Sequence, residues 1–174
     1  MTPNVDSYLP ETKIQQRIAE LGKKITEDYR DQDLLVVGIL NGSFMFTADL
    51  VRKIKTPHEI DFISVSSYGA DTVSSGKVTM ELDFRKEIKG RHVLLVEDIV
   101  DTGTTLSSLR PFLEERGPAS LKLASLLHKP SRTKYPTTID YLGFEIDDLF
   151  VVGYGLDLDG KYRELPYIGT YHGD

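Results

Sequence analysis

Apolar residues recur along the chain in two arrangements, one typical of helices and the other of buried strands. Residues 11–30 carry an apolar stripe at the three- and four-residue spacing of an amphipathic helix. The members of this stripe are Ile14, Ile18, Leu21 and Ile25. Residues 34–39 (LLVVGI) instead form a near-continuous apolar run, as expected for a parallel strand buried on both faces. The pattern therefore predicts a helix that leads into a strand of a parallel sheet.

The same patterns predict the other elements. Further strands are expected over residues 58–68, 78–83, 93–96, 120–127, 139–144 and 149–154. Helices are expected over residues 44–54 and from Gly103 to about Arg116, and Pro111 should kink or shorten the second of these helices. The polar stretches at residues 69–77 (GADTVSSGK) and 128–138 are expected to be loops.

Strands that alternate with helices predict an α/β fold with a mostly parallel central sheet flanked by helices. The chain has 174 residues, the length of one domain, and shows no internal repeat, low-complexity tract or linker. We therefore expect residues 1–174 to form a single domain. Ligands of such sheets bind outside the carboxyl ends of the strands, so the polar residues that follow strands are the candidates for a functional site.

Composition narrows the class of protein. Hydrophobic residues make up 40% and charged residues 28%, which is ordinary for a globular domain, and there is no Cys to form disulfides or thiolate metal sites. The four His lie far apart, with no pair at zinc-ligand spacing. The N-terminus lacks the basic and apolar regions of a signal peptide, and no apolar stretch reaches the length of a membrane span. We therefore expect a cytoplasmic protein with no membrane partner.

The net charge of −6 argues against a nucleic acid as the partner. It does not exclude a small anionic substrate, because backbone amides and metal ions bind phosphates inside acidic proteins. A pocket for such an anion should therefore be sought locally.

The segment EDIVDTGTT at residues 97–105 carries the clearest chemical signal. Two adjacent carboxylates, Glu97 and Asp98, follow the buried run at residues 93–96, and Asp101 comes next. The Thr/Gly turn after it opens a helix, where free backbone N–H groups, hydroxyls and the helix dipole favour an anion. Such a turn suits a phosphate, whereas the carboxylates suit ribose hydroxyls or Mg²⁺. A plainer interpretation is that Asp101 and Thr102 cap the helix and the other acids face solvent.

This segment resembles the phosphoribosyl pyrophosphate signature of the type I phosphoribosyltransferases. The resemblance extends over nearly the whole chain to the hypoxanthine and hypoxanthine-guanine members of that family. The supporting pieces are LNGS at 40–43, SSYG at 66–69, HKPSR at 128–132 and the stretch at 140–169. It implies the type I phosphoribosyltransferase fold, with a small hood formed by terminal segments, and Mg²⁺ as the cofactor.

By this resemblance, Glu97 and Asp98 hold the ribose hydroxyls and are candidate Mg²⁺ ligands. The 5′-phosphate lies in the turn formed by Asp101, Thr102, Gly103, Thr104 and Thr105. Asp101 is also implied as the general base near N7 of the purine. The reaction then joins the base to C1 of the ribose and displaces pyrophosphate, through a transition state with positive charge on the sugar.

Two loops have implied roles. Asn41 and Gly42 are expected to bind pyrophosphate through the backbone, often with a non-proline cis peptide, here Leu40-Asn41. Asn41 departs from the Lys that many relatives carry, so their charge contact is not carried over. Ser67 and Tyr68 belong to an implied lid, which continues through the polar loop at residues 69–77 and would exclude water from the activated ribose.

The base-binding residues are implied to be Lys129, Phe150, Val151 and Leu156. Lys129 would donate to the purine O6 and so select 6-oxopurines over adenine, although a solvated lysine at a strand end is the plainer interpretation. Phe150 would stack on the base, where the pattern alone predicts a core residue. Val151 would bind the base through its backbone, and Leu156 would pack beside it.

Asp157 matches a ligand of the second Mg²⁺, and Arg163 matches a pyrophosphate contact. Asp159 is a competing metal ligand, because the sequence reads DLDGKYR without the aromatic residue that many relatives have after the first Asp. The expected partners are a purine base, phosphoribosyl pyrophosphate and further copies of the chain in a dimer or tetramer. Two other functions remain open: an RNA-binding regulator on the same fold, and a transferase for xanthine or another base.

Overall fold

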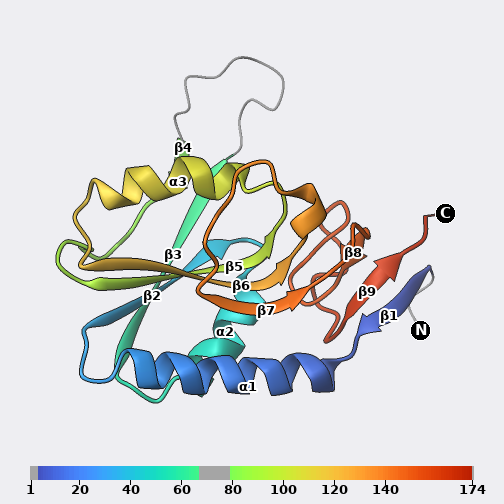
Figure 1. The fold of residues 1–174 in the computed structure, drawn as a ribbon. Coiled ribbons are helices and arrows are strands. Elements are labelled where there is room, and N and C mark those ends of the chain that lie inside the picture. Colours follow the sequence, from blue (N-terminus) through green and yellow to red (C-terminus); the bar gives the residue numbers. More distant parts are fainter. Residues whose placement is uncertain (1–3, 67–78, 174) are drawn as a thin grey trace.

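The computed structural model describes residues 4–66 and 79–173 (Figure 1). The predicted lid residues Ser67 and Tyr68, together with the predicted loop at 69–77, lie outside the described residues. In the part that is described, no helix is both long and apolar enough to cross a membrane.

A six-stranded sheet forms the centre of the fold, in the order β4-β3-β2-β5-β6-β7. Its strands are β2 (Leu34–Leu40), β3 (His58–Ser66), β4 (Thr79–Leu82), β5 (His92–Val100), β6 (Ser120–His128) and β7 (Tyr141–Glu145). All neighbours are parallel except β3 and β4, which pair antiparallel at one edge. The predicted α/β fold with a mostly parallel sheet is confirmed.

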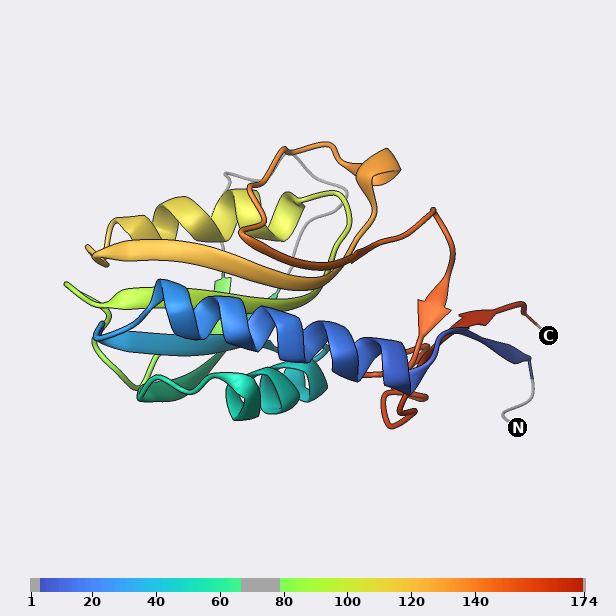
Figure 2. The same ribbon diagram turned by 60° about the horizontal axis from the view of Figure 1, so that its bottom comes forward.

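Helices cover both faces of this sheet (Figure 2). Helices α1 (Glu11–Asp28) and α2 (Phe44–Lys53) lie on one face, and α3 (Thr104–Glu114) lies on the other. The predicted stripe of α1 is fully buried, because Ile14, Ile18, Leu21 and Ile25 all belong to the core on that face. Strand side chains alternate between the two cores, so Val36 packs toward α1 while Val37 packs toward α3.

Helix α3 passes through Pro111 and ends at Glu114, before the predicted limit at Arg116. Its predicted apolar face is confirmed, because Leu106, Leu109 and Leu113 are buried. Pro111 lacks a backbone N–H and so cannot donate to the preceding turn. Its position in the last turns fits the prediction of a shortened helix.

Strand β5 is longer than predicted, and this difference moves the acidic residues. The prediction ended the strand at residue 96, yet Glu97 pairs with Ser125 and Val100 pairs with His128 in the ladder to β6. The carboxylates of Glu97 and Asp98 are therefore held by a regular strand rather than by a loop. The sequence pattern missed this extension because strand pairing, and not apolarity, continues the strand through charged residues.

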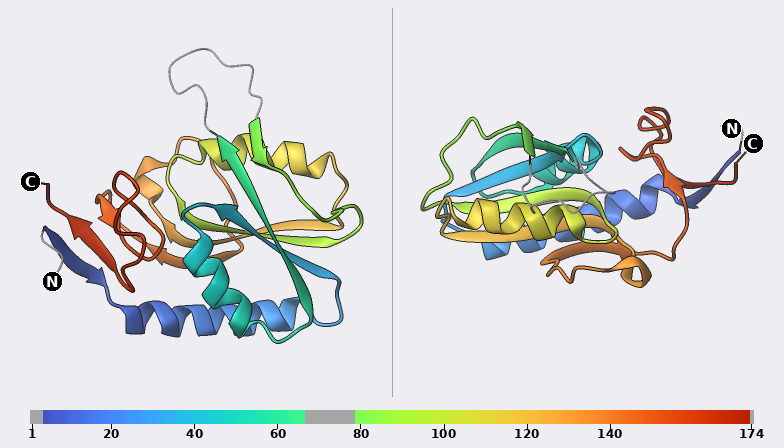
Figure 3. Two further views of the ribbon diagram at one scale, coloured as in Figure 1. Left: turned by 180° about the vertical axis from the view of Figure 1, so that it is seen from behind. Right: turned by 90° about the horizontal axis from the view of Figure 1, so that it is seen from above.

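The terminal segments form a second, three-stranded antiparallel sheet in the order β1-β9-β8. It consists of β1 (Val5–Leu9), β8 (Val151–Val152) and β9 (Ile168–Tyr171), and it stands beyond the carboxyl ends of the central strands (Figures 1 and 3). This sheet is the predicted hood. The strand predicted at residues 149–154 is wrong in extent, because Gly153 and Gly155, at φ +95° and +98°, turn the chain after β8.

Candidate active site

The candidate site lies where the carboxyl ends of β2, β5 and β6 face the segment that follows β8 (Figure 3). Close packing at two glycines holds these segments together. A side chain at Gly42 would overlap the carboxylate of Asp98, and a side chain at Gly155 would overlap the carbonyl of Gly42. The predicted cis peptide at Leu40-Asn41 is present in the same loop. Loops distant in the sequence are therefore brought together by glycines, and the hydrophobic pattern gave no sign of this.

Glu97 and Asp98 are held in the interior at the end of β5. Burial, together with the charge of Asp98, raises the pKa of Glu97 well above its usual range. Burial also raises the pKa of Asp98 to about 6, although Arg163 opposes the shift. The interpretation of these acids as solvent-facing is therefore wrong for Glu97, whose exposed fraction is 8%. Buried carboxylates of this kind need hydroxyl donors or a cation as partners.

The turn at residues 101–105 forms a pocket at the N-terminus of α3. The pocket is lined by Glu97 and by residues 99–106. Gly103 has φ +81° and is the N-cap residue, and no side chain caps the helix. The carbonyl of Thr102 accepts hydrogen bonds from the backbone N–H groups of Lys134 (3.0 Å) and Tyr135 (2.9 Å), which tie the turn to the segment after η1 (Pro130–Arg132). The pocket combines a helix N-terminus with hydroxyl groups, as an anion site requires.

Asp101 does not cap the helix, so the plainer interpretation of this residue is wrong. Its Oδ1 accepts from Nε of Arg132 at 3.0 Å. Lys129 also differs from a solvated strand-end lysine, because it is only 8% exposed and its Nζ lies 3.6 Å from Oδ1 of Asp148. Arg132 and Asp148 were assigned no role from the sequence, although Arg132 belongs to the HKPSR motif.

Phe150, Val151 and Leu156 lie around the start of β8 and the turn behind it. Phe150 is 53% exposed and is therefore not the core residue that its pattern predicts. Its ring makes an edge contact with Tyr171, with centroids 6.2 Å apart. Val151 and Leu156 are buried. An exposed aromatic face beside buried aliphatic residues can accept a flat heterocycle.

Asp157 and Arg163 meet in the turn that follows Gly155. Asp157 accepts from Nη2 of Arg163 at 2.9 Å and from the backbone N–H of Gly160 at 2.7 Å. The charges of both side chains act on the pKa of Asp98, which Arg163 lowers and Asp157 raises. Asp159 is exposed and has φ +50°.

The donor set suits Mg²⁺ bound together with a phosphorylated ligand. Among residues 4–66 and 79–173, no three His, Cys, Asp or Glu side chains cluster closely enough to hold a metal by themselves. Asp98 and Asp157 offer carboxylates from two directions, and Mg²⁺ is commonly bound by one or two carboxylates plus water and substrate phosphates. The arrangement therefore fits an ion that arrives with its substrate.

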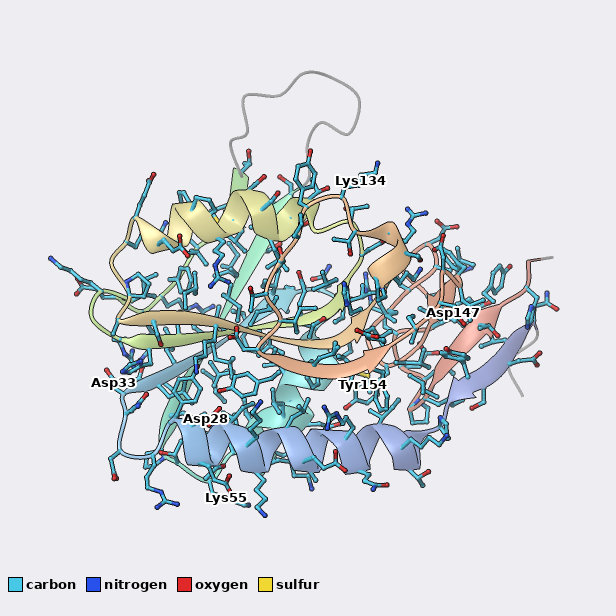
Figure 4. All side chains as sticks on the ribbon, viewed as in Figure 1. Asp28, Asp33, Lys55, Lys134, Asp147 and Tyr154 are labelled. Atoms are coloured by element: carbon cyan, nitrogen blue, oxygen red, sulfur yellow. The ribbon has the colours of Figure 1, made fainter. Side chains whose placement is uncertain are left out.

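Tyr154 is a further residue that sequence reasoning missed. It is 1% exposed, and its hydroxyl donates to Oδ2 of Asp49 in α2, which also accepts from Nε2 of Gln15 at 2.8 Å. Figure 4 places Tyr154 between the central sheet and helix α1. The two flanking glycines, Gly153 and Gly155, were the available signal, because a bulky residue between two turn-forming glycines indicates an anchored turn.

Comparison with known proteins gives a consistent result. A model of the phosphoribosyl transferase domain matches residues 4–159. The hypoxanthine phosphoribosyltransferase of Escherichia coli K12 is 48% identical over 171 residues, which span 97% of this chain and 96% of that enzyme. The hypoxanthine-guanine phosphoribosyltransferase of Dictyostelium discoideum is 48% identical over 163 residues, 91% of each chain.

Solved structures agree. The crystal structure of a hypoxanthine phosphoribosyltransferase from Staphylococcus aureus superposes with a TM-score of 0.93 at 45% identity, covering 97% of this chain and 92% of that one. Fold, sequence and site geometry thus lead to one assignment. The chain belongs to the type I phosphoribosyltransferase family, in its hypoxanthine and hypoxanthine-guanine branch.

Proposed function

We propose that this chain is a purine salvage enzyme that transfers the phosphoribosyl group of phosphoribosyl pyrophosphate to hypoxanthine or guanine. The products are IMP or GMP and pyrophosphate. The observation that supports the proposal most directly is that one pocket contains both buried Glu97 and the turn at residues 101–105. A sugar phosphate needs both features side by side: carboxylates for its hydroxyls and a helix N-terminus for its phosphate.

Asp101 acts as the general base in this proposal. N9 of the purine forms the bond to C1 of the ribose while the bond from C1 to the pyrophosphate oxygen breaks. The proton on N7 passes to the Asp101 carboxylate, which keeps the purine electron-rich as the bond forms. Glu97 and Asp98 hold the ribose hydroxyls, and Thr102, Gly103, Thr104 and Thr105 complete the phosphate site with Asp101.

Four other residues are proposed to recognise the base. Lys129 donates to O6, Phe150 stacks on the ring, Val151 binds the base through its backbone, and Leu156 packs at the edge. The burial of Lys129 supports this role, because a buried ammonium needs an acceptor and the O6 oxygen supplies one.

Pyrophosphate leaves along the surface formed by the loop of Asn41 and Gly42 and by Arg163. Asp157, with Glu97 and Asp98, would hold Mg²⁺ when the phosphorylated substrate binds, and the ion would neutralise the leaving group. Asp157 is preferred over Asp159, because Asp157 is half-buried and pairs with Arg163 at 2.9 Å, whereas Asp159 is exposed. We further propose a homo-oligomer, which light scattering of the purified chain would test.

The decisive experiment supplies phosphoribosyl pyrophosphate and Mg²⁺ with each of five bases: hypoxanthine, guanine, xanthine, adenine and uracil. Nucleotide formation is followed by chromatography, with EDTA replacing Mg²⁺ as the control. We expect IMP and GMP in the presence of Mg²⁺ and none with EDTA. Absence of nucleotide from every purine base would refute the proposal, and a salt-sensitive RNA shift would then favour the regulator.

A further inference from the structure

The HKPSR motif at residues 128–132 contains two cations, and the proposed function uses only Lys129. Lys129 is the N-cap residue of the short 3-10 helix η1 (Pro130–Arg132), and Arg132 is its last residue, whose backbone N–H donates to the Lys129 carbonyl at 3.1 Å. This turn follows directly on β6, which pairs with β5 up to His128. The backbone N–H of Lys129 donates to the Val100 carbonyl of β5 at 3.0 Å, so the turn lies beside the end of β5.

Arg132 touches the proposed general base directly. Its Nε donates to Oδ1 of Asp101 at 3.0 Å, and its Nη1 lies 3.5 Å from Oδ2 of Asp148. The other oxygen of Asp148 lies 3.6 Å from Nζ of Lys129. The charges of Asp101, Arg132, Asp148 and Lys129 therefore alternate in an unbroken row. Asp101, followed by Asp148, raises the pKa of Arg132 above its ordinary value, so the guanidinium keeps its charge.

The pair does little for the stability of the fold. The side chains of Arg132 and Asp101 are 46% and 39% exposed, and ion pairs this exposed contribute little to stability. What the contact does supply is orientation. A guanidinium is a rigid planar fork, so Nε and Nη1 hold their two carboxylates at a fixed angle.

We infer that Arg132 is a positioning residue that sets the proposed general base and ties it to the lysine that recognises the purine. This inference rests on the proposed function. Arg132 engages Oδ1 of Asp101, so Oδ2 is the oxygen that receives the proton from N7. Through Asp148 the same guanidinium steadies Lys129, whose target O6 lies next to N7 on the same edge of the purine. The N7 and O6 partners of the purine are thereby held by one rigid group.

The test compares Arg132→Gln and Arg132→Lys with the wild type in single-turnover experiments, which measure chemistry separately from product release. We expect Arg132→Gln to lower the single-turnover rate about tenfold, the scale of a loss of orientation. The KM for phosphoribosyl pyrophosphate should change less than twofold. Arg132→Lys, which restores the charge without the fork, should recover part of the rate. Arg110→Gln removes a comparable ion pair with Glu114 in α3, together with a hydrogen bond to the Leu121 carbonyl, and serves as the control.

A double variant separates positioning from a general structural effect. If Arg132 acts through Asp101, then adding Arg132→Gln to Asp101→Asn should cause no further loss of rate. Losses that multiply in the double variant would overturn the inference, as would a tenfold rise in the KM for phosphoribosyl pyrophosphate with an unchanged rate, which would make Arg132 a phosphate ligand. An inactive wild type would instead count against the proposed function, so the two failures are distinct.

Discussion

The end of strand β5 and the segment at residues 154–163 bring acidic side chains to the same candidate site by different means. Glu97 and Asp98 are carried by a regular strand, and burial raises the pKa of both, so their ionised forms are held in surroundings that disfavour them. Segment 154–163 belongs to none of the named helices or strands. Hydrogen bonds hold it instead, from the Tyr154 hydroxyl to Asp49 and from Arg163 to the Gly155 carbonyl at 2.6 Å.

This difference indicates where function and stability oppose each other. On β5 the backbone ladder stabilises the position of charges that themselves destabilise the fold, a common arrangement at active sites. Segment 154–163 is held in place by its polar contacts, so removal of one of them should destabilise the fold and disturb the site. Substitutions in the two regions should therefore change the free energy of unfolding with opposite signs.

The largest expected effect is on catalysis at the turn after β5. Asp101→Asn should lower the single-turnover rate by ~10²–10⁴, or about 3–5 kcal/mol in the barrier, since a positioned acid–base group is worth this much. The free energy of unfolding should change by less than about 1 kcal/mol, because the pair with Arg132 is exposed. Glu27→Gln, an exposed carboxylate on α1, is the control. An unchanged single-turnover rate would show that Asp101 is not the base.

Asp98→Asn tests the claim that β5 holds its charges at the expense of stability. The folded pKa of about 6 exceeds the ordinary 3.8, so the folded state binds the proton more tightly. Above pH 6 the ionised Asp98 therefore lowers the free energy of unfolding by about 3 kcal/mol, at 1.36 kcal/mol per pKa unit. This loss of stability shrinks as the pH falls from 6 and is gone below about 4.

We therefore expect the variant to be more stable than the wild type at pH 7.5, by about 3 kcal/mol, and equally stable near pH 4. The measurement is urea unfolding in EDTA at both pH values. Activity with Mg²⁺ should fall, since Asp98 is proposed to hold the ribose hydroxyls and Mg²⁺. A variant that is less stable at pH 7.5 would reverse the comparison between the two regions.

Much of the fold followed from apolar periodicity, because most central strands and all three helices bury one face or both. The exceptions have physical causes. Strand β5 continues through Glu97 and Asp98 because β6 supplies its hydrogen-bond partners, and β8 is short because Gly153 turns the chain. Strands β1 and β9 were expected only as a terminal hood, since strands of five and four residues carry little apolar signal.

The site divides in the same way. The pocket around the turn at residues 101–105 could be predicted because strand, turn and helix start are contiguous in sequence, and its use as an anion site stays a prediction. The partners of Asp101 and Lys129 could not be predicted, because Arg132 and Asp148 reach them from separate segments. Nor could residue patterns distinguish Phe150 on the surface from a core aromatic. Its exposure depends on where the hood stands relative to the sheet.

Lys129→Gln tests recognition of the base by the residue that directly follows β6. The ammonium donates to a purine O6 and cannot accept from a 6-amino group, so its loss should narrow the preference for hypoxanthine over adenine. A charged hydrogen bond is worth about 1.5–3 kcal/mol, or roughly ten- to a hundredfold in the ratio of the two kcat/KM values. Lys89→Gln, at an exposed position, should leave the ratio unchanged. A constant ratio in Lys129→Gln would place discrimination in the backbone around Val151.

Tyr154→Phe gives the smallest expected effect and the opposite sign to Asp98→Asn. The substitution keeps the buried ring and removes a hydroxyl whose acceptor, Asp49, retains Gln15 and Arg52 as partners. The loss should therefore stay near the low end for a hydrogen bond to a charged group, about 1.5 kcal/mol in the free energy of unfolding. Because the same segment carries Asp157 and Arg163, the KM for phosphoribosyl pyrophosphate should rise as well. Urea unfolding and initial-rate kinetics measure the two effects, and Tyr135→Phe, whose side chain is 50% exposed, is the control. If Tyr154→Phe matched that control in both measurements, the packing of Gly155 on Gly42 would be sufficient to hold segment 154–163. The proposed contrast with β5, in which side-chain hydrogen bonds hold this segment, would then be wrong.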